Sequence, residues 1–529
     1  DVDKDSNPRT SVVVWDDWAG GLGLYSTDGK EGLNRFSFSR CTTQYKGHLV
    51  IPLFFINMAY VGVSGDILET NERAGLIHAA ANNGTDAYSW NPADDTWSGK
   101  LHDFPAAVTD SLNFTLGGTE YVAFAHTGGY SYSSNGTSYT DDTTSPTLHM
   151  AFWDDRLWGI DNTGQLWFSS TIGVEIDDAK LSLPAGYVNG LFTGPDAAGE
   201  DILYASTEVG LYAHDAANAR FVKTKVAFPQ NTFAGKGAAT WNGEIYISPG
   251  GMAVWRYDPE RGVIIPIGLD RDGGLPILHR GNVQRLIPTH NGLLAVVNTT
   301  IQGSIYEYTG LGWHFVAYYA ADIDSAHASD VNGTYRLYYT GEAASRYLAL
   351  QVGQVNPDED VLIYDTVLGV WEHITPWFNA GQNEIDKTAI RVRIDCTNMT
   401  STETVGVRYG LDYSDDYESS SFSITSSGVT TLTFPTIADN NVEAGSDFRA
   451  IRFKFILNNG STTTLSPNVK SLSLEWRRKI PARYGFEFTI NRSESYGGKT
   501  PKEMKADLIT AIETSAQVEF TFVDDDGST

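Results

Sequence analysis

The chain has 529 residues, which corresponds to roughly two to four domains, and it carries a formal net charge of −28. This excess of carboxylates argues against a protein that grips nucleic acid or an anionic membrane surface, because both tasks need clustered cations. The 52 Gly, 27 Tyr and 13 Trp favour many short strands and tight turns over long amphipathic helices.

Residues 1–46 are predicted to form an N-terminal arm or a closing strand. Asp1, Asp3 and Asp5 alternate as calcium ligands do, although the glycine and glutamate of an EF-hand loop are missing. They are candidate metal ligands, and a solvated acidic loop is the alternative interpretation. Val12–Trp15 is predicted to be a strand, which either completes the last blade of a propeller or docks elsewhere.

Residues 47–380 repeat one pattern about every 40–50 residues, a spacing typical of four-stranded propeller blades. Each copy has an apolar strand, a turn such as Asn242-Gly243, and a strand rich in Tyr and Trp. We expect about seven blades, with the aromatic side chains filling the gaps between neighbouring sheets. The last copy is assigned to the segment that ends near Trp371.

Residues 381–482 change to alternating apolar and polar residues with turn residues between them, which predicts an antiparallel β-sandwich. Residues 483–529 read as a small β-α-β module. Thr500-Pro-Lys-Glu503 has the pattern of a helix start with a capping box, and the helix is expected to run to about Thr514. Tyr484–Ile490 and Val518–Val523 are the strands expected on either side of it.

Recognisable catalytic and cofactor motifs are absent from the sequence. There is no nucleophile elbow, no Walker A loop and no metalloprotease His pair, so no catalytic or cofactor-binding residue is assigned and enzymatic activity stays uncertain. The segment from Ile160 to Trp167 lacks the Ser and Asp of a sialidase aspartate box and is interpreted as an ordinary hairpin. Further acidic fragments around Asp270, Asp322 and Asp358 are similar, and solvated acidic loops are the favoured interpretation over calcium sites for all four fragments.

The two cysteines, Cys41 and Cys396, are far apart in sequence, and two buried free thiols are expected rather than a disulfide.

The C-terminal third resembles tail and minor tail structural proteins of tailed bacteriophages. The resemblance rests on Arg449–Phe455, Asn459-Gly460, the Ser466-Pro467 entry to the strand ending at Trp476, and the strand, helix and Asp-Gly turn that follow. In such proteins a further strand follows the Asp-Gly turn, so the small module is expected to be incomplete after Gly527.

The resemblance implies a mostly β virion component that contacts other virion proteins and copies of itself. The propeller would serve assembly or contact with a host surface, such as a glycan, and the C-terminal modules would anchor it. The expected location is therefore the phage particle, or otherwise the extracellular space, without membrane insertion or nucleic-acid binding. Two alternatives stay open, a carbohydrate-active enzyme that uses propeller carboxylates and a cellular glycan-binding propeller.

Overall fold

A computed structural model describes most of the chain and places more than half of the described residues in β-strands. The described residues are 10–22, 34–41, 48–52, 56–57, 66–94, 96–161, 163–177, 183, 187–269, 279–300, 302–319, 321–330, 335–341, 344–348, 371–414, 416–417, 422–434, 446–460, 465–479 and 498–513. Residues 1–479 form one compact unit and residues 480–529 form a second.

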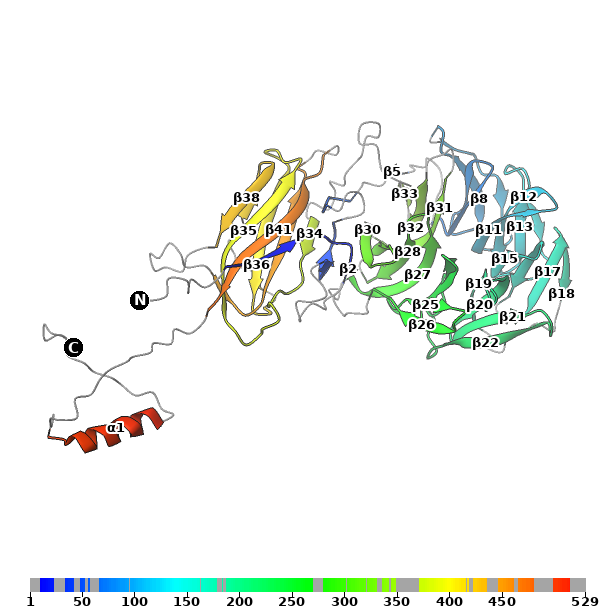
Figure 1. The fold of residues 1–529 in the computed structure, drawn as a ribbon. Coiled ribbons are helices and arrows are strands. Elements are labelled where there is room, and N and C mark those ends of the chain that lie inside the picture. The colour runs from blue at the N-terminus through cyan, green and yellow to red at the C-terminus, as the bar shows by residue number, and fades with distance from the viewer. Residues whose placement is uncertain are drawn as a thin grey trace. The chain divides into compact units, whose positions relative to one another are not determined.

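Seven antiparallel sheets of the first unit, six with four strands and one with five, follow one another along the described part of the chain (Figure 1). In chain order they contain β6 (Glu69–Arg73), β7 (Leu76–Ala81), β8 (Asp86–Asn91), β9 (Thr96–Trp97) and β10 (His102–Asp103); β11 (Val108–Leu116), β12 (Thr119–His126), β13 (Gly129–Ser133) and β14 (Thr140–Asp142); β15 (His149–Trp153), β16 (Arg156–Ile160), β17 (Leu166–Thr171) and β18 (Val174–Asp177); β19 (Val188–Pro195), β20 (Asp201–Thr207), β21 (Gly210–Asp215) and β22 (Arg220–Ala227); β23 (Ala239–Trp241), β24 (Glu244–Ile247), β25 (Trp255–Asp258) and β26 (Val263–Pro266); β27 (Gly281–Pro288), β28 (Leu293–Thr299), β29 (Gly303–Tyr308) and β30 (Trp313–Tyr319); and β31 (Ile323–Ser329), β32 (Arg336–Gly341) and β33 (Ala344–Leu348) with β5 (Ile56–Asn57).

These sheets are the blades of a closed β-propeller, as predicted. The first strand of each sheet contacts the first strand of the next, and β31 of the last sheet contacts β6 of the first, so the ring is complete. The outermost strand of the last blade is β5, which precedes the first blade in sequence and pairs with β33 through Asn57↔Arg346 and Ile56↔Tyr347. The ring is therefore closed by hydrogen bonds between two ends of the propeller segment.

Aromatic side chains pack between adjacent blades, as the repeat pattern predicted. Tyr130 of the second blade stacks on Trp167 of the third, with ring centroids 5.1 Å apart, and Phe114 and Phe152 stack at 5.5 Å across the same gap. A radial array of twisted sheets leaves a gap that widens outward, and these large flat side chains fill it.

Tight hairpins connect the strands within the blades. Asn242 and Gly243 take φ values of 50° and 75°, the left-handed pair that a two-residue hairpin requires.

The β-sandwich of the first unit also agrees with the prediction, and its strands from β34 to β41 are drawn from yellow-green to orange in Figure 1. Its buried alternate residues, such as Val405, Phe453 and Leu472, form the core between the sheets. One sheet contains β1 (Ser11–Trp15), β41 (Asn468–Arg478), β35 (Lys387–Thr397), β38 (Gly428–Thr433) and β39 (Ser446–Phe448), and the other β37 (Phe422–Ile424), β36 (Thr404–Leu411), β40 (Ile451–Asn458), β34 (Trp371–Ile374) and β4 (Phe38–Ser39).

The N-terminal segment joins the sandwich and does not close the propeller. β1 pairs antiparallel with β41, with Ser11 opposite Trp476, and β4 pairs with β34. Leu49 bridges to Val469 of the same sandwich. The blue β1 is visible beside the orange β41 in Figure 1. Of the two interpretations of the N-terminal segment, the arm that docks outside the propeller is therefore correct. The strand that closes the propeller ring is β5.

The sandwich also begins earlier than the predicted boundary at residue 381. Trp371, which the repeat pattern assigned to the propeller, lies in β34 opposite Leu457 of β40. Its ring is buried and lies 6.2 Å from that of Tyr318 in the sixth blade. An aromatic residue after a polar stretch is typical of both folds, so the sequence pattern alone did not distinguish them.

Propeller and sandwich share one continuous hydrophobic core within the first unit. Phe36 packs on His314 of the sixth blade with ring centroids 5.8 Å apart, and Phe38 packs on His279 at 4.8 Å. β2 (Gly21–Leu22) and β3 (Arg35–Phe36) form a short parallel pair, and β2 also contacts β30. We call these contacts between residues 10–41 and the sixth blade the seam.

Both cysteines are buried and free, as expected, and burial raises the pKa of the Cys396 thiol to about 12.

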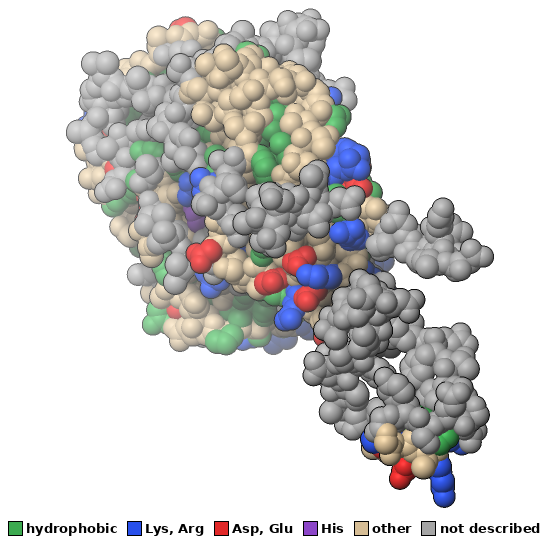
Figure 2. Space-filling view, turned by 90° about the vertical axis from the view of Figure 1, so that its left-hand side faces the viewer, with side chains coloured by type: hydrophobic (Ala, Val, Ile, Leu, Met, Phe, Trp, Pro, Cys, Tyr) green, Lys and Arg blue, Asp and Glu red, His purple; other side chains and the backbone are tan. Residues whose placement is uncertain are grey.

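Figure 2, turned so that the left-hand side of Figure 1 faces the viewer, shows acidic and basic side chains interspersed. Ion pairs of sandwich residues include Arg449–Asp386 at 3.0 Å and Arg393–Glu475 at 3.8 Å.

The second unit contains α1 (Pro501–Glu513), and its start confirms the predicted capping box. Glu503 accepts a hydrogen bond from the Thr500 backbone nitrogen at 2.7 Å, and the Thr500 hydroxyl accepts one from the Glu503 nitrogen at 3.4 Å. The predicted strands Tyr484–Ile490 and Val518–Val523 lie outside the described residues. None of the helices that the structure describes combines the length and apolarity needed to cross a membrane.

Candidate functional site

The innermost strands of the blades surround a polar pocket of about 610 Å³ in the propeller. Its wall is built from the first strand of six blades and from the turn that precedes β23. The side chains that give it chemical character come from β6, β11, β15, β19, β27 and β31 and include Glu69, Asp110, His149, Asn189, Gln284, Arg285, Asp324 and His327, with Lys236 from the turn. This is a suitable size for a small ligand, because such pockets measure roughly 300–1,000 Å³.

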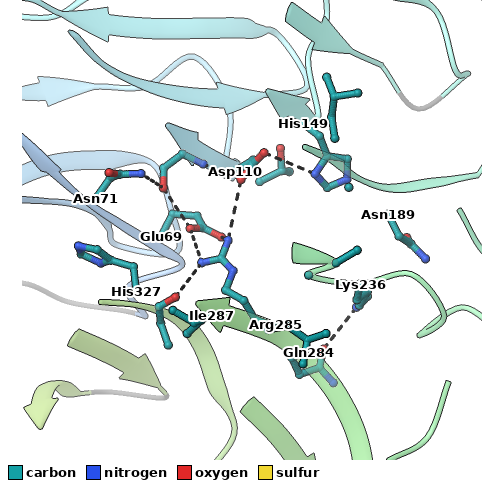
Figure 3. A pocket seen from close by; sticks show the side chains of 18 of the residues that line it. Glu69, Asn71, Asp110, His149, Asn189, Lys236, Gln284, Arg285, Ile287 and His327 are labelled. Atoms are coloured by element: carbon teal, nitrogen blue, oxygen red, sulfur yellow. Dashed lines mark hydrogen bonds and ion pairs between the residues drawn. The ribbon is translucent and has the colours of Figure 1, made fainter. Parts of the chain in front are cut away.

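Arg285 is the central side chain of one half of the pocket (Figure 3). Its two terminal nitrogens donate to both oxygens of Glu69 at 2.9 and 3.1 Å, a bidentate geometry. It also donates to the Ser325 hydroxyl at 3.1 Å and lies 3.9 Å from Asp110. One guanidinium from the sixth blade thereby joins the seventh, first and second blades, and spans the junction where the ring closes.

The Glu69 carboxylate has almost no contact with solvent, since its side chain is 8% exposed. Burial raises the pKa of Glu69, and the positive charge of Arg285 opposes that rise. Ser111 and Ser325 each donate a hydroxyl hydrogen bond to Glu69 Oε2 at 3.2 Å. Every strong interaction of this carboxylate is therefore made within the protein.

Asp110 has fixed partners as well. Its Oδ1 accepts a hydrogen bond from the Ser111 nitrogen at 2.9 Å and its Oδ2 one from the Met150 nitrogen at 3.0 Å. The imidazole Nδ1 of His149 lies 3.7 Å from Oδ2. This carboxylate holds the second and third blades together while remaining at the wall of the pocket.

His327 lines the same half of the pocket as Arg285 and is uncharged at neutral pH. Its Nδ1 is 3.0 Å from the Thr70 hydroxyl, and its ring stacks on Tyr338 at 5.5 Å. Burial, together with the nearby Arg285 charge, lowers the pKa of His327 to about 3. Its contacts are those of a packed wall residue.

The other half of the pocket contains Lys236, Gln284 and Asn189 (Figure 3). Lys236 Nζ lies 3.5 Å from Gln284 Oε1 and 5.0 Å from the centre of the Phe233 ring. Burial lowers the pKa of Lys236. The amide nitrogen of Asn189 donates to the Ala234 carbonyl at 2.7 Å.

The candidate metal ligands of the sequence do not define this site. Asp1, Asp3 and Asp5 lie outside the described residues, as do the fragments at Asp270 and Asp358. Asp322 and Asp324 are exposed, and Asp324 lines the pocket. Within the described ranges, no group of three or more His, Cys, Asp or Glu side chains could hold a metal ion.

The pocket residues themselves were missed by sequence reasoning. Asp110, His149, Asn189, Lys236, Gln284 and Asp324 follow one another at intervals of about 40–50 residues, the period of the blades. A polar residue at the same place in successive repeats is the signal that could have revealed the pocket, because equivalent inner strands face one axis.

No family model matches the chain, and no curated protein matches it. Among solved structures, the extracellular domain of a hybrid two-component system protein from B. thetaiotaomicron is 14% identical, with a TM-score of 0.42 over 61% of this chain and 44% of that one. The β-propeller domain of Cps50 (Swd1) from Myceliophteria thermophila is also 14% identical, with a TM-score of 0.42 over 56% of this chain and 100% of that one. This chain therefore spans less than half the length of the bacterial domain.

Proposed function

We propose that the chain is a structural component of a bacteriophage virion, in which the sandwich carries the propeller and the propeller contacts a host-surface glycan. The observation that carries the proposal is the path of the chain. It passes through the sandwich at β1, β4 and Leu49 before the propeller, and it returns to the sandwich at β34 after it. Both ends of the propeller segment are therefore attached to the same β-sandwich.

The shared core supports this division of roles. Buried contacts such as Phe36–His314 and Tyr318–Trp371 join the propeller to the sandwich. A propeller held in this way separates from the sandwich less easily than one on an exposed linker. Resemblance of the C-terminal third to phage tail proteins supports the particle as the location. The interspersed charges of the sandwich surface suit contacts with other proteins better than contacts with nucleic acid.

The proposal is tested by measuring whether the chain is incorporated into phage particles. Deletion of residues 480–529 leaves every strand of the propeller and sandwich in place, because these residues form a separate unit. We expect the full chain to co-sediment with purified particles, and the shortened chain to fold with an unchanged melting temperature but to be lost from them. Recovery of the full chain only in the particle-free fraction would contradict the proposal.

The second candidate is a carbohydrate-active enzyme, and the two carboxylates beside Arg285 are the observation that favours it. Acid–base hydrolysis of a glycoside needs one carboxyl group to donate a proton and another to act as base or nucleophile. Glu69 is instead committed to Arg285, and Asp110 to two backbone nitrogens. We therefore expect binding without turnover, and release of reducing ends from a bound glycan would favour the enzyme.

A further inference from the structure

The two halves of the pocket differ in how their charges are balanced. On one side, Glu69 and Asp110 surround Arg285, so its positive charge is neutralised within the protein. On the other side, Lys236 is the charged side chain, and it stands next to the amides of Gln284 and Asn189. Figure 3 shows this separation, with the carboxylates gathered around Arg285 and Lys236 beside Gln284.

Lys236 has no carboxylate partner among the residues that the structure describes. Among the described residues, Arg285 forms ion pairs with carboxylates and Lys236 does not. The polar contact of Lys236 Nζ is the side-chain amide oxygen of Gln284, at 3.5 Å. A half-buried ammonium group without a counter-ion is costly, because burial disfavours its charge. An anion that enters the pocket from solvent would remove this cost.

The charge of the surroundings limits that anion to a single negative charge. Asp110 and Asp324 also line the pocket, and the chain as a whole carries −28. A phosphate or a nucleic acid would bring two or more negative charges towards these carboxylates with one lysine to compensate, and like charges at short range repel. A carboxylate matches one ammonium group.

The remaining wall suits a ligand rich in hydroxyl groups. Asn189 donates its amide hydrogens to the Ala234 and Thr232 carbonyls, at 2.7 and 3.2 Å, which fixes the side chain with its carbonyl oxygen as an acceptor. Leu148 and Ile287 add apolar surface to the same pocket. Polar groups at fixed positions between apolar patches are what a sugar ring requires, since its hydroxyls lie at the edge and its C–H groups on the faces.

We propose that the pocket binds a saccharide unit with one carboxylate, such as a uronic acid, and that Lys236 is the counter-ion of that carboxylate. This inference rests on the proposed glycan contact and names the class of glycan. The carboxylate lies against Lys236 Nζ, and the hydroxyls of the ring face the amides of Asn189 and Gln284. The Glu69–Arg285 pair keeps the opposite wall in place and takes no part in recognition.

The test uses the full chain and pairs of oligosaccharides that differ only in a uronic acid or its neutral sugar, first on an array and then by titration calorimetry. Lys236→Met removes the counter-ion and is expected to leave the melting temperature unchanged or raised, since it replaces a half-buried charge with an apolar chain. Lys225→Met, an exposed lysine on the outer strand β22, is the matched control. Lys236→Arg keeps the charge.

We expect the acidic member of a pair to bind, and Lys236→Met to weaken it about 10- to 100-fold, the range for a lost charge-assisted hydrogen bond. Lys225→Met and Lys236→Arg should retain most of the binding. Equal binding of acidic and neutral members, or an unchanged affinity of Lys236→Met, overturns the inference and leaves the glycan contact standing. If no glycan binds, the glycan contact fails as well, while incorporation into particles is judged by its own experiment.

Discussion

Arg285 joins four blades through one side chain, and its removal should show how much the ring depends on it. Arg285→Met leaves the Glu69 carboxylate buried without a positively charged partner. Breaking such a pair costs about 3–5 kcal/mol, because the remaining charge cannot be solvated. We therefore expect a large fall in the free energy of unfolding, measured by urea denaturation.

Arg261→Met is the control for Arg285→Met. Arg261 pairs with Asp258 at 3.6 Å, but its side chain is 76% exposed. An exposed pair contributes about 0–1 kcal/mol. Equal losses of stability in the two variants would show that the Glu69–Arg285 pair does not hold the ring.

Buried histidines at the seam, and His373 of β34 beside it, make the stability of the first unit sensitive to acid. Burial lowers the pKa of His314 and His279 to about 4, and that of His373 to about 3. The unfolded chain takes up protons on these rings near pH 6.5, whereas the folded chain does not until about pH 4. Their contribution to stability is therefore complete above pH 6.5 and is lost as the pH falls towards 4.

The pH dependence can be measured as the melting temperature at pH 7.5 and at pH 5. At pH 5 each of these histidines costs about 2 kcal/mol of stability, from about 1.4 kcal/mol per pKa unit. Glu307 acts in the opposite direction, because burial raises its pKa to about 7, and burial raises the pKa of Glu69 as well. The histidines with lowered pKa values, which also include His327, outnumber these carboxyl groups. We expect a clear decrease at pH 5, and a smaller one in a His314→Phe variant. A melting temperature that does not change would contradict this account.

Contacts between individual side chains that are far apart in the sequence were the hardest feature to predict. Glu69 and Arg285 are 216 positions apart and meet because the ring closes between them. Nothing in the local pattern around either residue indicates the other, since neither lies in a motif. The capping box at Thr500 was predictable for the opposite reason, because its partners are three residues apart.

At the scale of elements, the seam depends on two glycines where backbones approach closely. A Cβ atom on Gly312 would lie 2.1 Å from the Gly20 carbonyl oxygen, and one on Gly21, whose φ is +69°, would lie 2.6 Å from the Trp313 nitrogen. Gly312→Ala should therefore force β2 away from the sixth blade, at a cost of about 1–3 kcal/mol.

Hydrogen exchange of residues 10–41 measures the effect of Gly312→Ala at the seam. We expect faster exchange in this segment and little change in the outer strands of the second blade. Gly99→Ala, where nothing lies within 4 Å of the added methyl group, is the control. Protection equal to that of the unaltered chain would mean that the close approach of the two backbones is not needed for docking.

The sandwich strands were predicted closely because alternation is a local signal. The segment 388–395 was expected as a strand and lies within β35, Lys387–Thr397. The partner of a strand is not a local property, and this explains the placement of the arm. Val12–Trp15 is a short apolar run that indicates a strand but no partner, and its partner β41 lies at the other end of the first unit.

At the scale of the whole molecule, the repeat period was enough to predict a propeller of about seven blades. It did not reveal that β5 closes the ring, because a two-residue strand carries no periodic pattern. The path of the chain through the sandwich, the propeller and the sandwich again followed only from the structure. That path is the basis of the proposal that the sandwich carries the propeller on a phage particle.

The proposed attachment of the propeller to a phage particle is best examined in a density map of purified particles that contain the chain. We predict a ring of seven sheets joined to a two-sheet sandwich, with neighbouring virion proteins in contact with the chain. Particles without such a ring, or a chain found only as a free monomer in the surrounding medium, would contradict the account.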